Sequence, residues 1–243
     1  MPEGPSIVIV KEAVHIFRKK KIIAVSGNSK IDQPRLLNQS VTDFKSHGKH
    51  FLICFKGFSL RVHFLLFGSY RINETKEATP RLHLKFSKGE LNLYACSVKF
   101  IEGDINEAYD WTSDVMNEDW DPKSALKKLR QQPEMMACDA LLNQEIFAGV
   151  GNIIKNEVLY RIKIHPASLC GEIPAPKLRT MTAEARKYSF QFLEWKKKFE
   201  LKQHWLAHTK KTCLRCDLPL IKEHLGKTNR RTFYCSNCQI LYK

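Results

Sequence analysis

Two Cys-x-x-Cys pairs near the C-terminal end constrain the fold of this chain more than any other feature. Cys213 and Cys216 form the first pair, Cys235 and Cys238 form the second, and 18 residues separate the pairs. This spacing is typical of a four-thiolate zinc site. Four protein ligands close the coordination shell, so we expect one structural Zn²⁺ with no catalytic position. A redox-active dithiol is the alternative, and it explains two pairs at this spacing less well.

The segment between the two pairs has the pattern of a β-hairpin. The sequence LPLIKEHLGKTNRRTFY holds two short apolar stretches on either side of a Gly-Lys-Thr-Asn turn, and Arg230 and Arg231 follow that turn. A metal-stapled hairpin of this kind would present arginine to a phosphate or a nucleic-acid groove. A solvated turn remains the alternative for one of the two arginines.

The charge of the chain is strongly and unevenly positive. Forty Lys and Arg residues against 25 Asp and Glu give a formal net charge of +15. Fourteen basic and five acidic residues lie between Met181 and Lys243, an excess of 14 − 5 = +9 that suits a polyanion. Residues 102–121 instead hold eight acidic and no basic residues, which predicts a solvated linker. We find no membrane-length apolar run and no secretory signal, and we expect an intracellular protein.

The first hundred residues have the pattern of a helix followed by an antiparallel sheet. Residues 6–19 carry an apolar stripe at helical spacing, made of Ile7, Val10, Val14 and Phe17. Residues 22–101 contain short apolar segments with turns at Lys56-Gly57 and Lys88-Gly89. An antiparallel β-sandwich would bury them.

The second half has the pattern of a helical domain. An Asp-Pro pair begins a helix at residue 121, and two further helices flank the turn Gly149-Val150-Gly151-Asn152, where Asn152 is placed to cap the second. Amides at such a turn also attract phosphate. A third helix is expected over residues 182–203, with a core-facing aromatic stripe made of Tyr188, Phe192, Trp195 and Phe199.

The N-terminal sequence Met-Pro-Glu-Gly-Pro could form a reactive site. If Met1 is removed, Pro2 carries a free secondary amine beside the carboxylate of Glu3. An α-amine with a pKa of about 7.7–8.0 is partly uncharged at neutral pH. It can attack an aldehyde-level carbon and form an iminium, and Glu3 could move the protons. On these five residues alone, a simple chain start is the better reading.

Two further segments carry features with both structural and functional readings. Lys49, in the sequence HGKH, could be a strand-end charge or could hold a phosphate near Pro2. The segment 63–68, HFLLFG, breaks the alternation of a strand and could be a core hairpin. If its tip is exposed, its bulky residues could insert between bases. This segment contains His63, Leu65, Leu66 and Phe67.

Taken together, these features resemble the formamidopyrimidine-DNA glycosylase and endonuclease VIII family of repair enzymes. The landmarks are the PEGP start, the lysine of HGKH, the segment LLNQEIFAGVGNIIKNEVLYRIKIHP, the paired Cys-x-x-Cys and an arginine five residues before Cys235. They occur in the family's order from Pro2 to Cys238. The resemblance implies an α+β protein with an N-terminal β-sandwich and leading helix, a helix–two-turn–helix domain and a zinc ribbon.

The resemblance also implies a reaction and roles for single residues. Pro2 would attack C1′ of a flipped, damaged nucleotide, Glu3 would shuttle protons, and elimination would cut the backbone on both sides of the lost base. The phosphate-gripping or proton-handling positions would be Lys49, Asn152 and Arg230, of which Arg230 is expected to clamp phosphate because its pKa is too high for an acid. The expected DNA-contacting residues are His63, Leu65, Leu66, Phe67, Asn152 and Arg231.

Branch features favour oxidised pyrimidines as lesions. PEGP resembles the endonuclease VIII branch, and Cys213 follows Pro166 by only 47 residues, as in forms without a long purine-recognition loop. Three positions depart from the family pattern. Ser6 stands where the family usually has a glutamate, and Leu65 stands where the branch commonly has a polar residue. Asp110 stands near a position where relatives often have a basic residue.

These interpretations give a domain plan and a function. We expect a catalytic β-sandwich domain over 2–108, an acidic linker over 109–122, a helix–two-turn–helix domain over 123–208 and a zinc ribbon over 209–243. The predicted protein is a monomeric bifunctional DNA glycosylase and abasic-site lyase. Its partner is double-stranded DNA with damaged bases or abasic sites, without membrane contact. The alternatives are a non-enzymatic zinc-ribbon nucleic-acid binder and an enzyme of the same class that is specific for oxidised purines.

Overall fold

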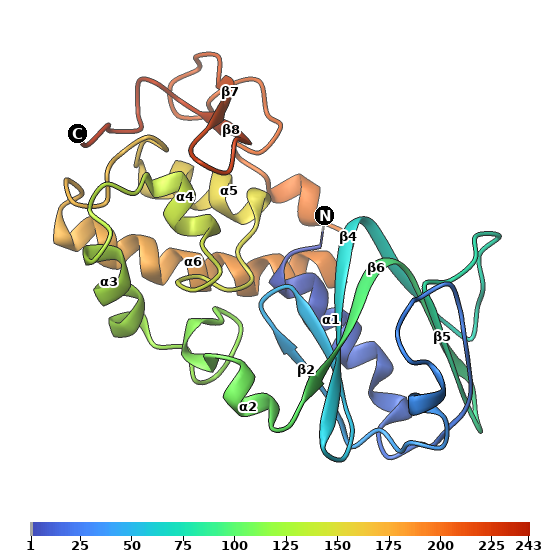
Figure 1. Ribbon diagram of the computed structural model, residues 1–243. Helices are drawn as coiled ribbons and strands as arrows, with labels where there is room; N and C mark the ends of the chain where they lie inside the picture. The colour runs from blue at the N-terminus through green and yellow to red at the C-terminus, as the bar shows by residue number, and fades with distance from the viewer. Residues whose placement is uncertain (1) are drawn as a thin grey trace. The chain divides into compact units, whose positions relative to one another are not determined.

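The computed structural model describes residues 2–243, which form two compact units (Figure 1). The first unit ends at Asp110 and the second begins at Trp111. Each unit has its own buried apolar cluster, one built on the sheet of the first unit and the other on the helices of the second. Within residues 2–243 no helix is both long enough and apolar enough to cross a membrane.

The first unit begins with the predicted amphipathic helix. Helix α1 (Gly4–Ala13) continues into a 3₁₀ turn (Val14–Phe17), so the α-helical part is shorter than expected. Its stripe is buried as predicted, with Ile7, Val10, Val14 and Phe17 at most 5% exposed. Burial of such a stripe supplies much of the stabilisation of a short helix.

The strands of the first unit form one antiparallel sheet. Its strands are β1 (Ile22–Ser26), β2 (Asp43–His47), β3 (His50–Cys54), β4 (Phe58–Ile72), β5 (Leu82–Phe86) and β6 (Glu90–Glu102). Among residues 2–243 their order is β1-β5-β6-β4-β3-β2, with antiparallel pairing throughout. The predicted antiparallel β architecture with a leading helix is confirmed.

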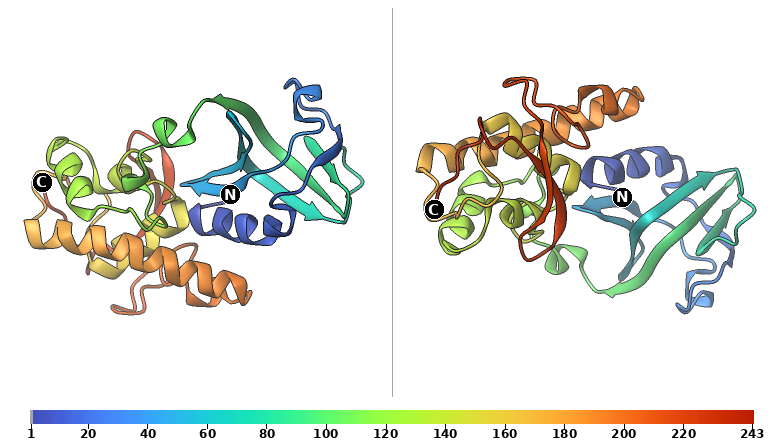
Figure 2. Two further views of the ribbon diagram at one scale, coloured as in Figure 1. Left: turned by 90° about the horizontal axis from the view of Figure 1, so that it is seen from below. Right: turned by 90° about the horizontal axis from the view of Figure 1, so that it is seen from above.

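The two layers expected of a sandwich are halves of this one sheet. The first part of β4 pairs with β3 and the last part of β6, whereas the last part of β4 pairs with the first part of β6, next to β5. A bulge between Phe64 and Ser69 separates the two parts of β4. Bulges bend and twist a strand. The long neighbouring strands β4 and β6 run through both halves (Figure 2).

The predicted hairpin turns occur at both Lys-Gly pairs. Gly57 lies between β3 and β4 with φ +83°, and Gly89 lies between β5 and β6 with φ +94°. Glycine reaches this left-handed region without a steric penalty. A short helix, α2 (Ile105–Ala108), follows β6 and is capped by Asp104.

The prediction of a solvated acidic linker is wrong for its second part. Residues 111–120 belong to the second unit, where Val115 is fully buried and Trp120 is 9% exposed. The Trp120 ring packs 5.8 Å from that of Phe147, and Arg186 donates a hydrogen bond to the carbonyl of Val115. The acidic composition of this segment suggested exposure, but its apolar residues are buried in the second unit.

The second unit is helical, as predicted, but its helix ends differ. Its helices are α3 (Pro122–Arg130), α4 (Ala137–Leu142), α5 (Asn152–Ile162) and α6 (Ala175–Lys197). Helix α3 begins at the Asp-Pro pair, with Asp121 accepting a hydrogen bond from the Lys123 amide. Helix α6 starts and ends earlier than residues 182–203. Phe199 therefore lies beyond its end and is 95% exposed, so its assignment to the core is wrong.

The chain ends in the predicted hairpin. Strands β7 (Ile221–Leu225) and β8 (Arg230–Tyr234) pair antiparallel, and the Gly-Lys-Thr-Asn turn joins them. The four cysteines gather at the other end of this hairpin.

Candidate active site, nucleic-acid contacts and metal centre

Pro2 and Glu3 lie immediately before α1. Glu3 is the N-cap residue, with φ −113° and ψ 171°, and its carboxylate makes no capping bond to the helix. Its side chain is nevertheless buried, at 2% exposure, while Pro2 is half-buried. The partial positive charge at the helix N-terminus favours an anion at this position. The Glu3 carboxyl group is thus buried at the start of α1, one residue after Pro2.

Ser6 lies one helical turn after Pro2. It is 8% exposed, and its hydroxyl oxygen is buried without a hydrogen-bond partner among the described residues. Pro2 itself lies before the helix, so Ser6 belongs to the first turn of the helix that follows Pro2 and Glu3.

Lys49 lies in the two-residue turn between β2 and β3. Gly48, with φ +54°, precedes it, and Lys49 itself is half-buried. Helix α1 packs against both strands of this hairpin. The first unit therefore joins the helix that follows Glu3 and the turn that carries Lys49 in one packed substructure.

Three histidines and a tyrosine surround the Lys49 turn. The His50 Nδ1 atom lies 3.1 Å from the Tyr109 hydroxyl, and the His50 and His63 rings meet edge to face at 5.4 Å. His47 Nε2 lies 3.0 Å from the backbone carbonyl of Asp110. Asp110 itself is exposed.

Burial lowers the pKa of two of these imidazoles and so favours their neutral form. It lowers the pKa of His50 to about 4, with Arg61 and the neighbouring histidines acting in the same direction. The pKa of His63 is also lowered, by burial first and by Lys49 next. The His63 Nδ1 atom is buried and has no hydrogen-bond partner among the described residues. The His63 imidazole, with this unpartnered Nδ1 atom, lies on β4 just before the bulge.

The three apolar residues of the β4 bulge are exposed. Leu65, Leu66 and Phe67 have 51%, 57% and 83% of their surface accessible, next to the buried Phe64. The segment is a bulged stretch of β4 and not a hairpin tip. Gly68 is needed there, because an added Cβ would lie 2.6 Å from that of Phe64. Exposed apolar clusters of this kind mark interaction sites.

The two turns between α4 and α5 are held by side-chain amides. The predicted helix stops at Leu142 because Asn143 accepts a hydrogen bond from the Glu145 amide, and Gln144 accepts one from Gly149. Gly149 has φ +98°, which suits glycine. The pattern at Gly149–Asn152 therefore predicted the turn correctly.

The assignment of Asn152 as helix cap is wrong. The N-cap residue of α5 is Gly151, and Asn152 is the first helical residue. Its side-chain amide instead donates to the backbone carbonyl of Arg231 at 2.9 Å. Asn152 Oδ1 is buried and has no hydrogen-bond partner among the described residues. The side chain therefore connects the glycine turn to the hairpin.

Three consecutive polar residues of α5 hold the C-terminal part of the chain, two of them at the hairpin and the third at the segment before it. Lys155, fully buried, donates to the Thr232 hydroxyl at 2.7 Å, and Asn156 accepts from the Phe233 amide at 3.2 Å. The buried Glu157 carboxylate accepts from the backbone amides of residues 206, 207 and 208 at 2.8–3.0 Å. Sequence reasoning missed this anchor, although the run Lys-Asn-Glu within an otherwise apolar helix was a signal.

Arg230 and Arg231 open strand β8, directly after the turn. Arg230 is half-buried and Arg231 is exposed, and the Arg231 carbonyl faces α5. The second unit therefore places the Asn152 side chain against the backbone of Arg231.

The four cysteines form a compact cluster suited to a metal. The Sγ atoms of Cys213, Cys216, Cys235 and Cys238 all lie within 4.8 Å of one another. A tetrahedron with Zn–S bonds of about 2.3 Å has edges of roughly 3.8 Å, and the Cys213–Cys238 pair is 3.7 Å apart. Donors to the sulfurs surround the site.

The surrounding donors favour thiolates over thiols. Arg215 donates to Cys238 Sγ at 3.0 Å, Asn237 donates to Cys216 Sγ at 3.3 Å, and the Tyr160 hydroxyl lies 3.2 Å from Cys213 Sγ. Such outer contacts orient metal ligands. The residues therefore fit a metal of the zinc type.

Comparison with known sequences identifies both units. The family model for the formamidopyrimidine-DNA glycosylase N-terminal domain matches residues 1–100, and that for the formamidopyrimidine-DNA glycosylase H2TH domain matches residues 112–194. Endonuclease 8-like 2 of Bos taurus is 34% identical over 74% of this chain and 58% of that protein. Endonuclease 8-like 3 of Xenopus laevis is 27% identical over 90% of this chain and 38% of that protein. The chain spans less than two thirds of the length of these relatives.

Comparison with solved structures confirms the fold. The formamidopyrimidine-DNA glycosylase of Lactococcus lactis, solved with DNA that contains an abasic site, superposes with a TM-score of 0.86. The match covers 98% of this chain and 99% of that chain, at 21% identity. A viral DNA glycosylase gives the same TM-score at 20% identity. The chain belongs to the formamidopyrimidine-DNA glycosylase and endonuclease VIII family, in its endonuclease VIII-like branch.

Proposed function

We propose that the protein is a DNA glycosylase with abasic-site lyase activity that removes oxidised pyrimidines in base excision repair. The observation that carries this proposal is the buried carboxylate of Glu3 at the N-cap of α1, adjacent to Pro2. Family membership and the likeness to glycosylases solved with damaged or abasic DNA support it.

The reaction begins at the nitrogen of Pro2. Its lone pair attacks C1′ of the flipped nucleotide, and the bond from C1′ to the base breaks with the electron pair leaving on the base, which takes up a proton. Opening of the sugar breaks the C1′–O4′ bond, gives O4′ a proton and leaves an iminium at C1′. Glu3 is the group beside Pro2 that can carry these protons.

Strand cleavage follows from the acidity of the iminium. Loss of a C2′ proton breaks the C3′–O3′ bond and expels the 3′ phosphate, and a second elimination, with loss of the C4′ proton, breaks the C5′–O5′ bond and expels the 5′ phosphate. Water then hydrolyses the imine and frees Pro2. We assign Lys49 to the phosphates near this reaction, and Arg230 to a phosphate clamp, because a guanidinium with a pKa above about 12 does not give up a proton.

The remaining sites bind and distort the DNA. Asn152 and Arg231 contact phosphate from the second unit, and His63 does so from the first. Leu65, Leu66 and Phe67 fill the gap left by the flipped base, which their exposure permits. Four thiolates hold one Zn²⁺, which supplies folding energy to the hairpin and takes no part in the reaction.

The experiment is covalent trapping. The protein is mixed with duplex DNA carrying one thymine glycol, and borohydride reduces the iminium. We expect a stable complex in which peptide mapping places the DNA on Pro2 and intact mass shows that Met1 is absent. A protein with one extra residue before Pro2 is the control, and it must not trap because its proline nitrogen is an amide.

The outcomes separate the alternatives. Trapping on a lysine, or no trapping, contradicts the mechanism. DNA binding without base release indicates a non-enzymatic binder. Faster release of 8-oxoguanine than of thymine glycol indicates the purine specificity. A monomer is expected by light scattering, and the affinity for DNA should fall steeply with salt because counterions are released on binding.

A further inference from the structure

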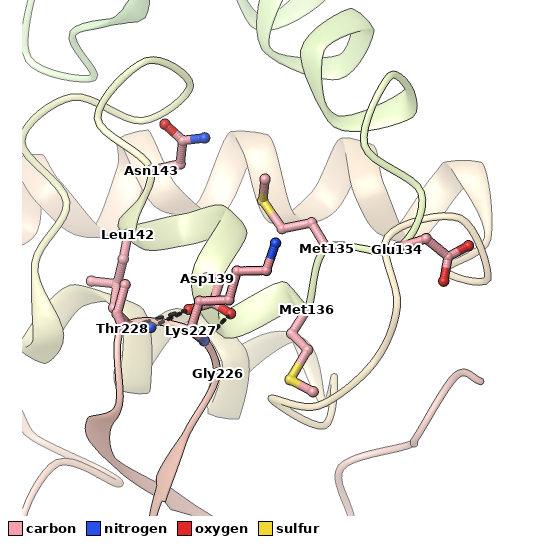
Figure 3. A pocket seen from close by; sticks show the side chains of 9 residues that line it. All are labelled: Glu134, Met135, Met136, Asp139, Leu142, Asn143, Gly226, Lys227 and Thr228. Atoms are coloured by element: carbon pink, nitrogen blue, oxygen red, sulfur yellow. Dashed lines mark hydrogen bonds between the residues drawn. The ribbon is translucent and has the colours of Figure 1, made fainter.

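The buried carboxylate of Asp139 holds the turn of the C-terminal hairpin. Asp139 lies in α4, is only 9% exposed, and accepts hydrogen bonds from the Lys227 amide at 2.8 Å, the Thr228 amide at 3.2 Å and the Thr228 hydroxyl at 3.1 Å (Figure 3). Hydrogen bonds to an ionised group are stronger than those between neutral groups. One carboxylate thus satisfies the polar groups of two consecutive turn residues.

The turn approaches Asp139 closely at Gly226. Gly226 has φ +73°, and a Cβ at that position would lie 2.4 Å from the Asp139 carboxylate oxygens. A side chain there would have to displace the carboxylate. The glycine and the aspartate are therefore matched to each other.

The hydrogen bonds to Asp139 tie the turn to α4. A cavity of about 580 Å³ lies beside them, with Met135, Met136 and Leu142 on one wall and the turn on the other. Figure 3 shows the dashed bonds from Asp139 to the turn at this cavity. Because open space adjoins the turn, few packed side chains can replace these bonds.

The turn leads directly into the two arginines. Arg230 is the first residue of β8, and the carbonyl of Arg231 accepts hydrogen bonds from Asn152 at 2.9 Å and Lys155 at 3.4 Å. The start of β8 is thus fixed twice, through its turn by α4 and through its backbone by α5. When the backbone of a binding residue is already fixed before binding, less conformational entropy is lost on binding.

We infer that Asp139 is a positioning residue that presents Arg230 and Arg231 to DNA phosphate. The inference rests on the proposed function. A negatively charged residue thereby favours the binding of a polyanion. Removal of its charge should weaken DNA binding, which is the opposite of the effect expected from charge alone. Neutralising an acidic residue should strengthen DNA binding by electrostatics alone.

The test uses the full protein and a probe that cannot be cleaved, a duplex with a tetrahydrofuran abasic analogue. We expect Asp139→Asn to weaken binding about three- to tenfold at fixed salt, the cost of disturbing one or two charge-assisted hydrogen bonds. Thr228→Val removes only the hydroxyl bond and should weaken binding about twofold. Zinc content and the unfolding midpoint verify that each variant is folded.

The matched control is Glu134→Gln. Glu134 is exposed, lines the same cavity and carries the same charge, but none of the turn's hydrogen bonds reaches it. This variant should bind the probe as tightly as wild type or slightly more tightly. A loss equal to that of Asp139→Asn would show that the weakening does not depend on the turn's hydrogen bonds, and it would overturn the inference.

A double-variant measurement tests whether Asp139 acts through the arginines. In an Arg230→Ala, Arg231→Ala background, Asp139→Asn should change the affinity no further, because the groups that it positions are gone. Equal losses in both backgrounds would overturn the inference. Failure of wild type to prefer the abasic analogue over undamaged duplex would instead contradict the proposed function. Normal wild-type binding with an unaffected Asp139→Asn variant would contradict only the inference.

Discussion

The side-chain amide of Asn152 donates a hydrogen bond of 2.9 Å to the backbone carbonyl of Arg231. This bond joins the first residue of α5, after the glycine turn, to the strand that carries the paired arginines. Two segments that lie 79 residues apart in the chain are thereby fixed relative to each other. The glycine turn and the hairpin therefore act as one DNA-contacting element in our proposal.

Loss of the Asn152 side chain should weaken DNA binding more than it lowers stability. We expect Asn152→Ala to raise the Kd for abasic-analogue duplex roughly tenfold, because it removes a DNA contact and releases the Arg231 carbonyl. Fluorescence anisotropy measures the Kd, and urea unfolding measures the stability. The exposed Gln131→Ala is the control and should change neither. Unchanged affinity of Asn152→Ala would remove Asn152 from the interface.

Removal of the metal should impair the hairpin and leave the N-terminal chemistry intact. We expect wild type to carry one Zn²⁺ per chain, and Cys213→Ala or Cys235→Ala to lose it and to bind DNA at least tenfold more weakly. Borohydride trapping at saturating DNA should persist, because Pro2 and Glu3 belong to the other unit. Cys96→Ala is the matched control, since burial raises the pKa of that thiol to about 12. Full zinc content in the Cys235 variant would refute the metal assignment.

The features predicted correctly from the sequence are those fixed by neighbours in the chain. The Lys-Gly turns, the Asp-Pro helix start and the spacing of the four cysteines each specify their structure within a few residues. The stripe of α1 is equally local, because one face of a short helix must be buried. Tertiary contacts did not need to be known for these.

The errors concern residues whose place depends on distant contacts. Asn152 resembles a cap, but Arg231 offers its side chain a partner that only the folded hairpin supplies. The segment around Trp120 is acidic, yet its ring finds Phe147 in the helical core. Asp139 and Lys155 are typical surface residues by type, and only the hairpin that folds onto them explains their burial.

Acid should destabilise the first unit through His50. Its pKa is about 4 in the folded protein because of burial, against an ordinary 6.5, so between these values the unfolded chain binds a proton that the folded chain does not. Stability is therefore complete above about pH 6.5 and falls as the pH drops toward 4. We expect His50→Gln to lose less unfolding free energy than wild type between pH 7 and pH 5 in urea titrations. An equal loss of unfolding free energy in both proteins would contradict the lowered pKa of His50.

The apolar bulge of β4 should act in base release and not in folding. Leu66 and Phe67 are 57% and 83% exposed, so Leu66→Ala and Phe67→Ala should change the unfolding free energy by no more than about 0.5 kcal/mol. Single-turnover release of thymine glycol should slow roughly tenfold, because the flipped state loses side chains that fill the gap and offset part of the cost of unstacking.

Cleavage at a preformed abasic site distinguishes a role of the bulge residues in base flipping from a general loss of activity. It should be reduced less than base release, because a nucleotide without a base is easier to extrude. Phe199→Ala is the matched control, since Phe199 is a highly exposed aromatic outside the bulge, at 95% exposure. If the bulge variants slow both reactions equally, or if Phe199→Ala slows base release as much as they do, the bulge residues do not stabilise the flipped state.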